Sequence, residues 1–368
     1  MFYKLIQKIC LSHWMFLYKW YKSLLSVVKW NSNFSHEFSV KKGTKQGSII
    51  SPSLFNIFID DLLIELHQCD TGVRVGKHKF NSSAYADDIH LLNLTMPGLQ
   101  RLIDVCYKYS KKWRFNFGLK KTKCLISGKY TLKCEPSWTL GGKSVENVDS
   151  MEILGVHYTS DGSSDAHIES RVQASRRAMY SLTAAGCAYP GLSSDVKTYL
   201  WKCSGLAALS YGLDTLDITK KSKQYLESVQ ASTLKRLLGL PIRSHSSQLM
   251  SALNVRKVSD IIGDGCISLW NRIFMVDSPA RVLCARLLAD YILYGSVIPG
   301  SLLGRLVSFG VSPLKSLFGF SQRVQVVDGA TPHENGVVDS LRYLVMHENF
   351  IKPYSDEHVL ARLLTKAF

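Results

Sequence analysis

Two adjacent carboxylates, Asp87 and Asp88, stand inside an otherwise apolar stretch of the chain. Strand-like residues on either side predict a hairpin that exposes both side chains at its turn. Like charges this close repel each other unless a cation lies between them. Mg²⁺ binds one or two protein carboxylates together with substrate phosphate oxygens, and a pair of such ions can activate a 3′-hydroxyl and stabilise a leaving pyrophosphate. We expect either a metal-dependent nucleotidyl-transfer site or, because Asp is common in turns, a solvated turn without a ligand.

The elements around this pair follow from hydrophobic spacing. Residues 2–30 have apolar side chains at helical spacing, which predicts helix up to the polar residues 31–33. Ser51 is expected to cap a helix that starts at Pro52 and carries an apolar stripe to residue 66. Short strands are predicted at 73–75, 79–80, 84–86 and 89–92, a helix from about 99 to 115, and mostly helix after residue 167. His90 is expected to face the other side of the sheet rather than bind a metal.

Four segments resemble the reverse transcriptases of non-LTR (LINE-type) retrotransposons. Residues 85–88 read Y-A-D-D, like the family's Y-x-D-D box, and residues 43–56 read GTKQGSIISPSLFN, like its G-x-x-Q-G-S-x-x-S-P-x-x-F-N segment. Residues 118–123 resemble the N-x-x-K-T segment, with Gly118 in place of the usual Asn, and residues 153–156 resemble Y-L-G-V. Several such boxes in the family's order and spacing are a specific pattern. The resemblance is clear over about residues 15–180 and fainter to about 275.

The resemblance implies a role for each matching residue. Asp87 would be a catalytic metal ligand and Asp88 a weaker or assisting one, in a two-ion site for Mg²⁺ or Mn²⁺. The expected partners are an RNA template, a DNA primer and dNTPs. The residues implied to contact nucleotide, template or primer are Tyr85, Gln46, Gly47, Ser48 and Lys121.

Charge supports a polyanionic partner independently of the motifs. Lys and Arg number 45 against 29 Asp and Glu, giving a net charge of +16, which favours nucleic acid or an anionic membrane surface. Residues 101–130 hold nine basic residues and one acidic residue. Trp113, Phe115 and Phe117 lie between these charges, as in surfaces that stack on bases, or else they belong to the core. The residues expected to contact the nucleic-acid backbone are Lys111, Lys112, Arg114, Lys120 and Lys123.

The resemblance also implies a third catalytic Asp, on a strand before the Gln-Gly-Ser block. The acidic residues before Asp87 do not match it; they are Glu37, Asp60, Asp61, Glu65 and Asp70. We therefore predict an N-terminally truncated copy that lacks the first catalytic Asp and is severely impaired in catalysis. The alternative is a catalytically dead remnant that binds nucleic acid.

The expected fold is α+β. The resemblance implies a partial right-hand polymerase palm, an antiparallel sheet with helices, followed by a mostly helical thumb and C-terminal region. We predict a palm and fingers remnant in residues 1–128, the end of the palm and a thumb-like region in 129–250, and a helical region of unknown role in 251–368. Nine scattered cysteines without a C-x-x-C pair indicate free thiols in a reducing compartment. An intracellular protein is expected, in nucleus or cytoplasm, without a membrane span.

Overall fold

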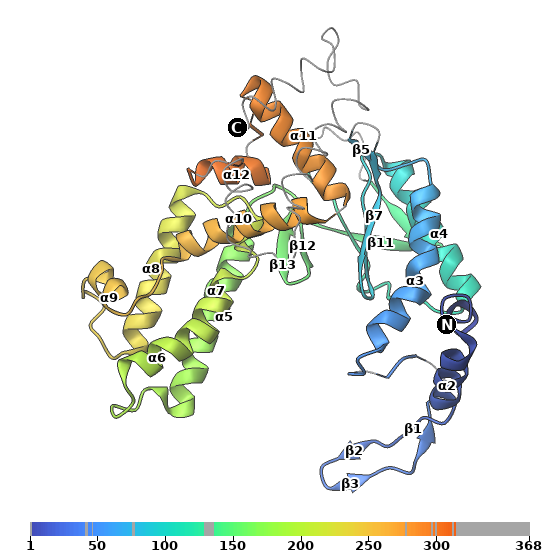
Figure 1. The fold of residues 1–368 in the computed structure, drawn as a ribbon, viewed down its shortest axis with the longest axis horizontal. Coiled ribbons are helices and arrows are strands. Elements are labelled where there is room, and N and C mark those ends of the chain that lie inside the picture. Colours follow the sequence, from blue (N-terminus) through green and yellow to red (C-terminus); the bar gives the residue numbers. More distant parts are fainter. Residues whose placement is uncertain are drawn as a thin grey trace, which may run out of the picture. The chain divides into compact units, whose positions relative to one another are not determined.

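The computed structural model describes residues 2–40, 43–45, 47–75, 78–128, 136–276, 278–295, 297–298, 300–310 and 313. The chain divides into two compact units: Met1–Thr122 with Leu132–Val145, and Lys123–Thr131 with Glu146–Phe368. Both contain helices and small sheets (Figure 1), so the mixed α+β class is confirmed. The three-part division stays a prediction, and residues 314–368 lie outside the described part of the chain. None of the helices among the described residues has the length and apolar character needed to cross a membrane.

The described residues of the first unit contain the helices α1 (Phe2–Leu5), α2 (Leu11–Lys22), α3 (Ser51–Gln68) and α4 (Met96–Trp113). The core of this unit forms where α3 and α4 meet through apolar side chains, which are Ile59, Leu62, Leu66, Leu102, Cys106 and Tyr109. The side chain of Thr95 caps α4 by accepting the Gly98 N–H at 3.2 Å. The helix predicted from about 99 to 115 is thereby confirmed, with an earlier start.

The prediction of continuous helix over residues 2–30 is wrong. Helix stops at Lys22, and residues 25–39 form a two-stranded antiparallel ribbon in which β1 (Leu25–Ser26) pairs with β4 (Phe38–Ser39) and β2 (Lys29–Trp30) pairs with β3 (Asn33–Phe34). The β-branched pair Val27-Val28 favours extended backbone over helix. The apolar spacing of residues 23–30 is too short a pattern to distinguish a helix from a β-ribbon.

The remaining strands of the first unit form three antiparallel pairs. Strand β5 (Val73–Val75) pairs with β6 (His78–Phe80), β7 (Ser82–Tyr85) with β8 (Asp88–Leu91), and β10 (Trp138–Leu140) with the first half of β11 (Lys143–Val148). Strand positions predicted from the sequence around 73–80 and 84–92 are confirmed.

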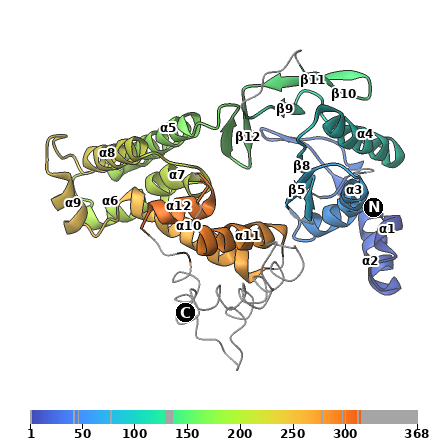
Figure 2. The ribbon, with the colours of Figure 1, turned by 90° about the horizontal axis from the view of Figure 1, so that it is seen from above.

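The second unit is mostly helical, as the sequence predicted (Figure 2). Its strands are β9 (Lys123–Leu125), which runs parallel to the last residues of β11, and the hairpin of β12 (Ser150–Ile153) with β13 (Val156–Thr159). Its core surrounds the buried side chains of Trp201, Trp270 and Phe274. The helices are α5 (Asp165–Leu182), η1 (Thr183–Cys187), α6 (Ser194–Trp201), η2 (Lys202–Leu206), α7 (Ala207–Ser210), η3 (Leu213–Thr215), α8 (Lys220–Leu237), α9 (Ser246–Ala252), α10 (Val258–Met275), α11 (Pro279–Tyr294) and α12 (Leu302–Ser308).

A buried histidine attaches the β12–β13 hairpin to these helices. His167 of α5 accepts the His157 backbone N–H at Nδ1 over 3.3 Å, and its Nε2 lies 2.9 Å from the Tyr211 carbonyl oxygen. This pair of contacts requires a neutral ring with its proton on Nε2. The Tyr211 hydroxyl donates to the Leu154 carbonyl at 2.7 Å, at the turn of the hairpin. Burial lowers the pKa of His167, and this effect outweighs the hydrogen bond to the Tyr211 carbonyl, which raises it. The charges of Arg171 and His157 lower the pKa further.

Acid should therefore weaken the second unit. A lowered folded-state pKa means that the stabilisation by neutral His167 is present above the ordinary histidine pKa of 6.5 and is lost as the pH falls below it. We expect the free energy of unfolding to decrease as the pH falls from about 7 to about 5, and His167→Gln to flatten this part of the profile. His245→Gln, which changes an exposed histidine, is the control. Denaturant titrations across pH measure the effect, and an identical pH profile for His167→Gln and the unmodified chain would contradict it.

Candidate functional site

Asp87 and Asp88 lie at the closed end of the β7–β8 hairpin, as predicted. Strand β7 ends at Tyr85, which pairs with Asp88, and Ala86 and Asp87 form the two-residue turn between them. Ala86 has φ of +50°, a left-handed conformation that costs a non-glycine residue about 1–3 kcal/mol and that gathers at functional sites. Both carboxylates are exposed, and the Tyr85 side chain is 66% exposed. The hairpin thus presents all three side chains to whatever approaches its tip.

The two faces of the hairpin differ in character. Ile89 and Leu91 face the core formed by α3 and α4 and are partly buried against it. Side chains alternate along a strand, so Tyr85, Asp88 and His90 share the opposite face. His90 was expected to face the other side of the sheet from the Asp pair. This is wrong with respect to Asp88, because Asp88 and His90 are two positions apart on β8 and therefore lie on the same face.

The base of the hairpin is fixed by a buried amide that the sequence did not reveal. Asn81, which precedes β7, is fully buried, and its Nδ2 donates to the Leu66 carbonyl at 2.6 Å and to the Thr71 carbonyl at 3.1 Å. The backbone carbonyl of Asn81 accepts the Leu92 N–H at 2.8 Å. Asn81 thereby joins both strands of the hairpin to the end of α3. A polar residue before a strand gives no sign of this role, because its partners lie 10 and 15 residues away.

The loop before α3 holds the Gln-Gly-Ser block. Gln46 lies outside the described residues. Gly47 has φ of +78°, and a Cβ placed there would meet no atom within 4 Å, so the Gly47 backbone is open to close approach. Ser48 accepts the Ser51 N–H at 3.1 Å through its carbonyl. The prediction that Ser51 caps the helix is wrong: its hydroxyl donates backward to the Lys45 carbonyl at 2.6 Å, which closes the loop instead.

The predicted backbone-binding residues are exposed but not equivalent. Lys111 and Lys112 lie in the last turn of α4, where the Lys112 ammonium is 3.8 Å from Glu65 Oε1. Arg114 follows in the left-handed conformation that ends the helix. Lys120 and Lys121 occupy an exposed turn closed by the Lys121 N–H to the Gly118 carbonyl at 2.8 Å. Lys123 begins β9 and belongs to the second unit.

Gly118 is not required by this turn. A Cβ built on Gly118 would lie 3.9 Å from the nearest Lys121 atom, which is ordinary contact, and its φ is not left-handed. The departure from the family's Asn at this position therefore leaves the turn itself unaffected.

The three aromatic residues between those charges belong to the core. Trp113, Phe115 and Phe117 are partly buried against the α3–α4 core, and Phe115 makes edge contacts with Phe58, Tyr109 and Phe117 at ring-centroid distances of 5.1–6.1 Å. Of the two alternatives for these rings, a base-stacking surface or the core, the structure shows the core, because α4 turns its amphipathic apolar side, and the residues that follow it, toward α3.

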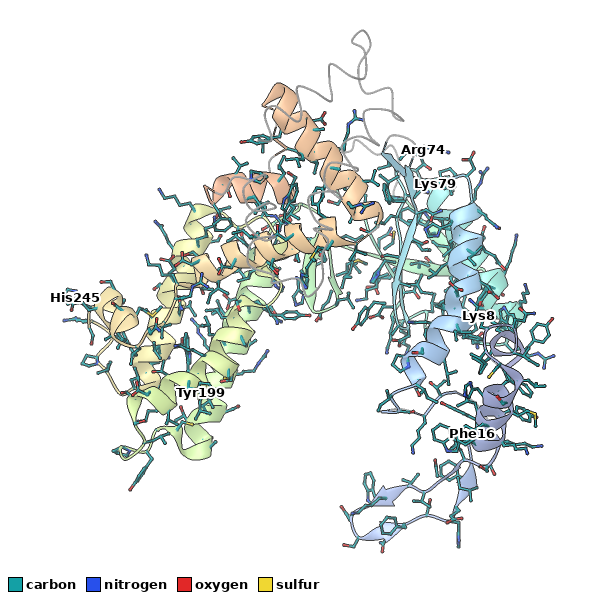
Figure 3. The ribbon with its side chains drawn as sticks, in the orientation of Figure 1. Lys8, Phe16, Arg74, Lys79, Tyr199 and His245 are labelled. Atoms are coloured by element: carbon teal, nitrogen blue, oxygen red, sulfur yellow. The ribbon has the colours of Figure 1, made fainter. Side chains whose placement is uncertain are left out.

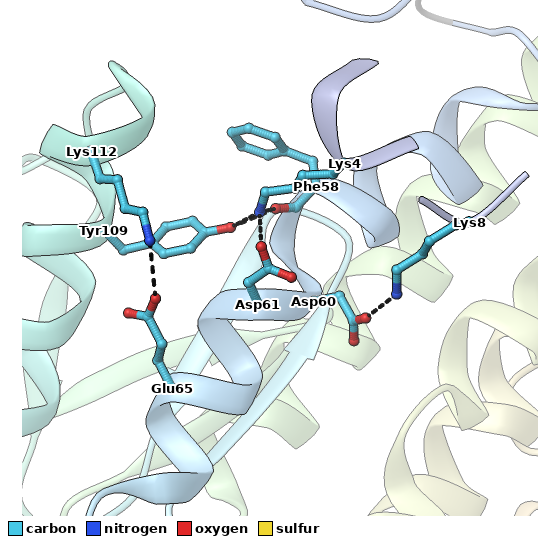
Figure 4. Close-up of polar contacts among 8 residues, drawn as sticks. All are labelled: Lys4, Lys8, Phe58, Asp60, Asp61, Glu65, Tyr109 and Lys112. Carbon is cyan, nitrogen blue, oxygen red and sulfur yellow. Dashed lines mark hydrogen bonds and ion pairs between the residues drawn. The ribbon is translucent and has the colours of Figure 1, made fainter. Parts of the chain in front are cut away.

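A buried ammonium joins α1 to both helices (Figure 4). Lys4 is 5% exposed, and its Nζ donates to the Phe58 carbonyl at 2.6 Å and to the Tyr109 hydroxyl, and lies 2.8 Å from Asp61 Oδ2. The same Nζ lies 4.3 Å from the centroid of the Trp113 ring, within the range of a cation–π contact. Burial raises the pKa of the Tyr109 hydroxyl, and the negative charge of Asp61 raises it further.

The acidic residues of α3 do not extend the Asp pair. Asp60 and Asp61 of α3 pair with Lys8 and Lys4 at 2.6 and 2.8 Å, and Glu65 lies near Lys112 (Figure 4). Within the part of the chain that the structure describes, no group of three or more His, Cys, Asp or Glu side chains could hold a metal ion. The hard carboxylate oxygens of Asp87 and Asp88 suit Mg²⁺ or Mn²⁺, but these two side chains alone do not complete a two-ion site.

Comparison with known families identifies the class of protein. Residues 3–158 match the family described as reverse transcriptase (RNA-dependent DNA polymerase). This segment contains the Y-A-D-D hairpin, the Gln-Gly-Ser loop and the core of α3 and α4. Residues 3–158 are therefore similar to a reverse transcriptase domain, in agreement with the resemblance that the motifs carry.

Its relatives are polymerases of non-LTR retrotransposons. The chain is 25% identical over 228 residues to the RNA-directed DNA polymerase from mobile element jockey of Drosophila melanogaster, covering 60% of this chain and 24% of that protein. It is 24% identical over 279 residues to the Pol polyprotein from the type-1 retrotransposable element R2 of Popillia japonica, covering 67% and 43%. Identity to the Pol polyprotein of the type-2 element R2DM of Drosophila melanogaster is 34% over 142 residues, covering 35% and 13%. The chain spans less than half the length of each.

The Lys4 contacts predict a specific loss of stability. Lys4→Ala removes a buried charge from three polar partners, and we expect it to lower the free energy of unfolding by about 2–3 kcal/mol. Lys8→Ala, four residues further along in the turn after α1, is the matched control, because the Lys8–Asp60 pair is exposed and such pairs contribute little. Denaturation followed by tryptophan fluorescence measures both variants. Equal losses for the two would contradict the role assigned to Lys4.

Proposed function

We propose that this chain is part of the RNA-directed DNA polymerase of a non-LTR retrotransposon. In this proposal residues 1–128 are the palm and fingers remnant, 129–250 the end of the palm and a thumb, and 251–368 a helical region of unknown role. The observation that carries it is the Y-A-D-D sequence at the exposed, strained tip of a hairpin inside the reverse transcriptase domain.

The site residues take the roles implied by the family. Asp87 and Asp88 would hold the divalent ions, which would supply activation of a primer 3′-hydroxyl and charge neutralisation at the triphosphate. The exposed ring of Tyr85 beside them would support the primer terminus. Gly47 offers the open backbone that a template or nucleotide needs, next to Gln46 and Ser48. Lys121, exposed in its turn, would offset charge on the triphosphate.

The metal site is the weak point of catalysis in this chain. Asp60 and Asp61 of α3, the acidic pair nearest in sequence before the hairpin's strands, pair with Lys8 and Lys4, and Glu37 lies in the exposed ribbon. None of them replaces the first catalytic Asp of the family, so a third carboxylate would have to come from outside the described residues. We therefore propose that the residues of this chain bind primer–template and incorporate nucleotides poorly or not at all.

Binding to primer–template should depend on the exposed lysines. Because each neutralised phosphate releases condensed counterions, we expect the affinity to fall steeply with salt. Lys120→Ala with Lys121→Ala should reduce the slope of log affinity against log salt by about 2. Lys8→Ala, which changes a lysine already paired with Asp60, should leave the slope unchanged.

The experiment combines this titration with primer extension on poly(rA)/oligo(dT) in Mg²⁺ and dNTPs. We expect salt-sensitive binding without appreciable incorporation. Binding that is insensitive to salt and to the lysine changes would contradict the nucleic-acid function. Incorporation that disappears in Asp87→Asn with Asp88→Asn would contradict the incomplete metal site and show that the hairpin is catalytic as it stands.

A further inference from the structure

The N-terminal ribbon, residues 25–39, is exposed to an unusual degree. Fourteen of its fifteen residues are exposed, Ser26 being half-buried. Its two strands bond to each other, for example through the Ser35 N–H to the Val28 carbonyl at 2.9 Å and the Val28 N–H to the Ser35 hydroxyl at 2.9 Å. A two-stranded hairpin is marginally stable in water by itself. A ribbon of this kind is expected to be covered when it functions.

The exposed side chains of the ribbon are large and apolar. Trp30 is 77% exposed and Phe34 is 65% exposed, and the others are Leu25, Val27, Val28 and Phe38. The register pairs Lys29 with Phe34 and Trp30 with Asn33, so Trp30 and Phe34 lie on opposite faces. Helix α2, which leads into the ribbon, adds exposed apolar groups such as Phe16 (Figure 3). Large exposed apolar side chains gathered in one segment are typical of binding surfaces.

The charges around the ribbon select a polyanionic occupant. Lys19, Lys22 and Lys29 are exposed, and the part of the chain that the structure describes gives none of them a carboxylate partner. Glu37 is the single acidic residue in the first 40 positions. The Lys29 ammonium lies 5.6 Å from the centroid of the Phe34 ring, so a cation and an aromatic ring share one face of the ribbon.

Other occupants fit less well. A second copy of a chain with a net charge of +16 would bring like charges against these lysines. Protein interfaces are depleted in lysine. Exposed aromatic rings next to lysines suit single-stranded nucleic acid, whose bases stack on the rings while its phosphates meet the cations.

We propose that the N-terminal ribbon binds single-stranded nucleic acid, with bases stacked on Trp30 and Phe34 and phosphates near Lys29. The inference deepens the proposed function, because it rests on a nucleic-acid substrate and adds a surface distinct from the Asp87–Asp88 hairpin. Binding at the ribbon requires no metal ion, because its ligands are rings and ammonium groups.

The test is fluorescence anisotropy of dye-labelled oligo(dT) and oligo(rU) with the full chain in EDTA. We expect Trp30→Ala and Phe34→Ala each to weaken binding by about tenfold, and Trp30→Phe to retain most of it. Tyr199→Ala is the matched control, because Tyr199 is 66% exposed on α6 of the second unit. Both changed side chains are exposed, so unaltered thermal unfolding of the variants confirms that they fold.

Three outcomes would overturn the proposal. One is single-strand affinity that is the same for Trp30→Ala and the unmodified chain. Another is binding to phosphatidylserine vesicles that is lost in Trp30→Ala while oligonucleotide binding persists, which would make the ribbon a membrane contact. The third is single-strand binding that requires Mg²⁺. Failure of the proposed function is distinguishable, because it would abolish the salt-dependent effect of Lys120 and Lys121 on primer–template and leave the ribbon variants informative.

Discussion

One buried cation holds together the scaffold of the first unit. The ammonium of Lys4 reaches across from α1 to the Phe58 carbonyl on α3 and the Tyr109 hydroxyl on α4, between aromatic rings and opposite Asp61. A charge in that position is tolerated because every donor finds a partner. The same two helices form the core against which the inner face of the β7–β8 hairpin packs. The direction in which the hairpin points therefore depends on the α3–α4 contact that Lys4 fixes.

The hairpin combines a rigid base with an exposed tip. Asn81 ties its first strand to the end of α3, and apolar contacts of Ile89 and Leu91 hold its second. Beyond these contacts the strands carry Tyr85, Asp87 and Asp88 outward to a turn with a left-handed Ala86. This is the arrangement expected of a site preorganised to meet a ligand, because the packed base of the hairpin fixes the position of two exposed carboxylates at its tip. The same arrangement explains why the pair needs further ligands before it can hold two ions.

The sequence predicted the parts of this domain that depend on local pattern. The Y-A-D-D box lies in a hairpin, and the helices around it begin and end near the expected positions, because turn residues, caps and apolar stripes are read within a few residues. Three features were not predictable in this way. The aromatic residues at and just after the end of α4 pack in the core, the Ser51 hydroxyl donates back to the Lys45 carbonyl, and residues 25–30 form part of a β-ribbon. Each depends on contacts made in the folded chain. Lys4 and Asn81 gave no sequence sign, since their partners lie 10 to 105 residues away.

The central claim, that Asp87 and Asp88 form a divalent metal site, is tested most directly by Mn²⁺ binding measured by electron paramagnetic resonance. The account predicts weak binding by the unmodified chain, lost in Asp87→Asn with Asp88→Asn and retained in Asp60→Asn, whose carboxylate is occupied by Lys8. Chemical denaturation of each variant verifies that the fold persists. Mn²⁺ binding that is absent from the unmodified chain, or unchanged when both hairpin carboxylates are removed, would contradict the account.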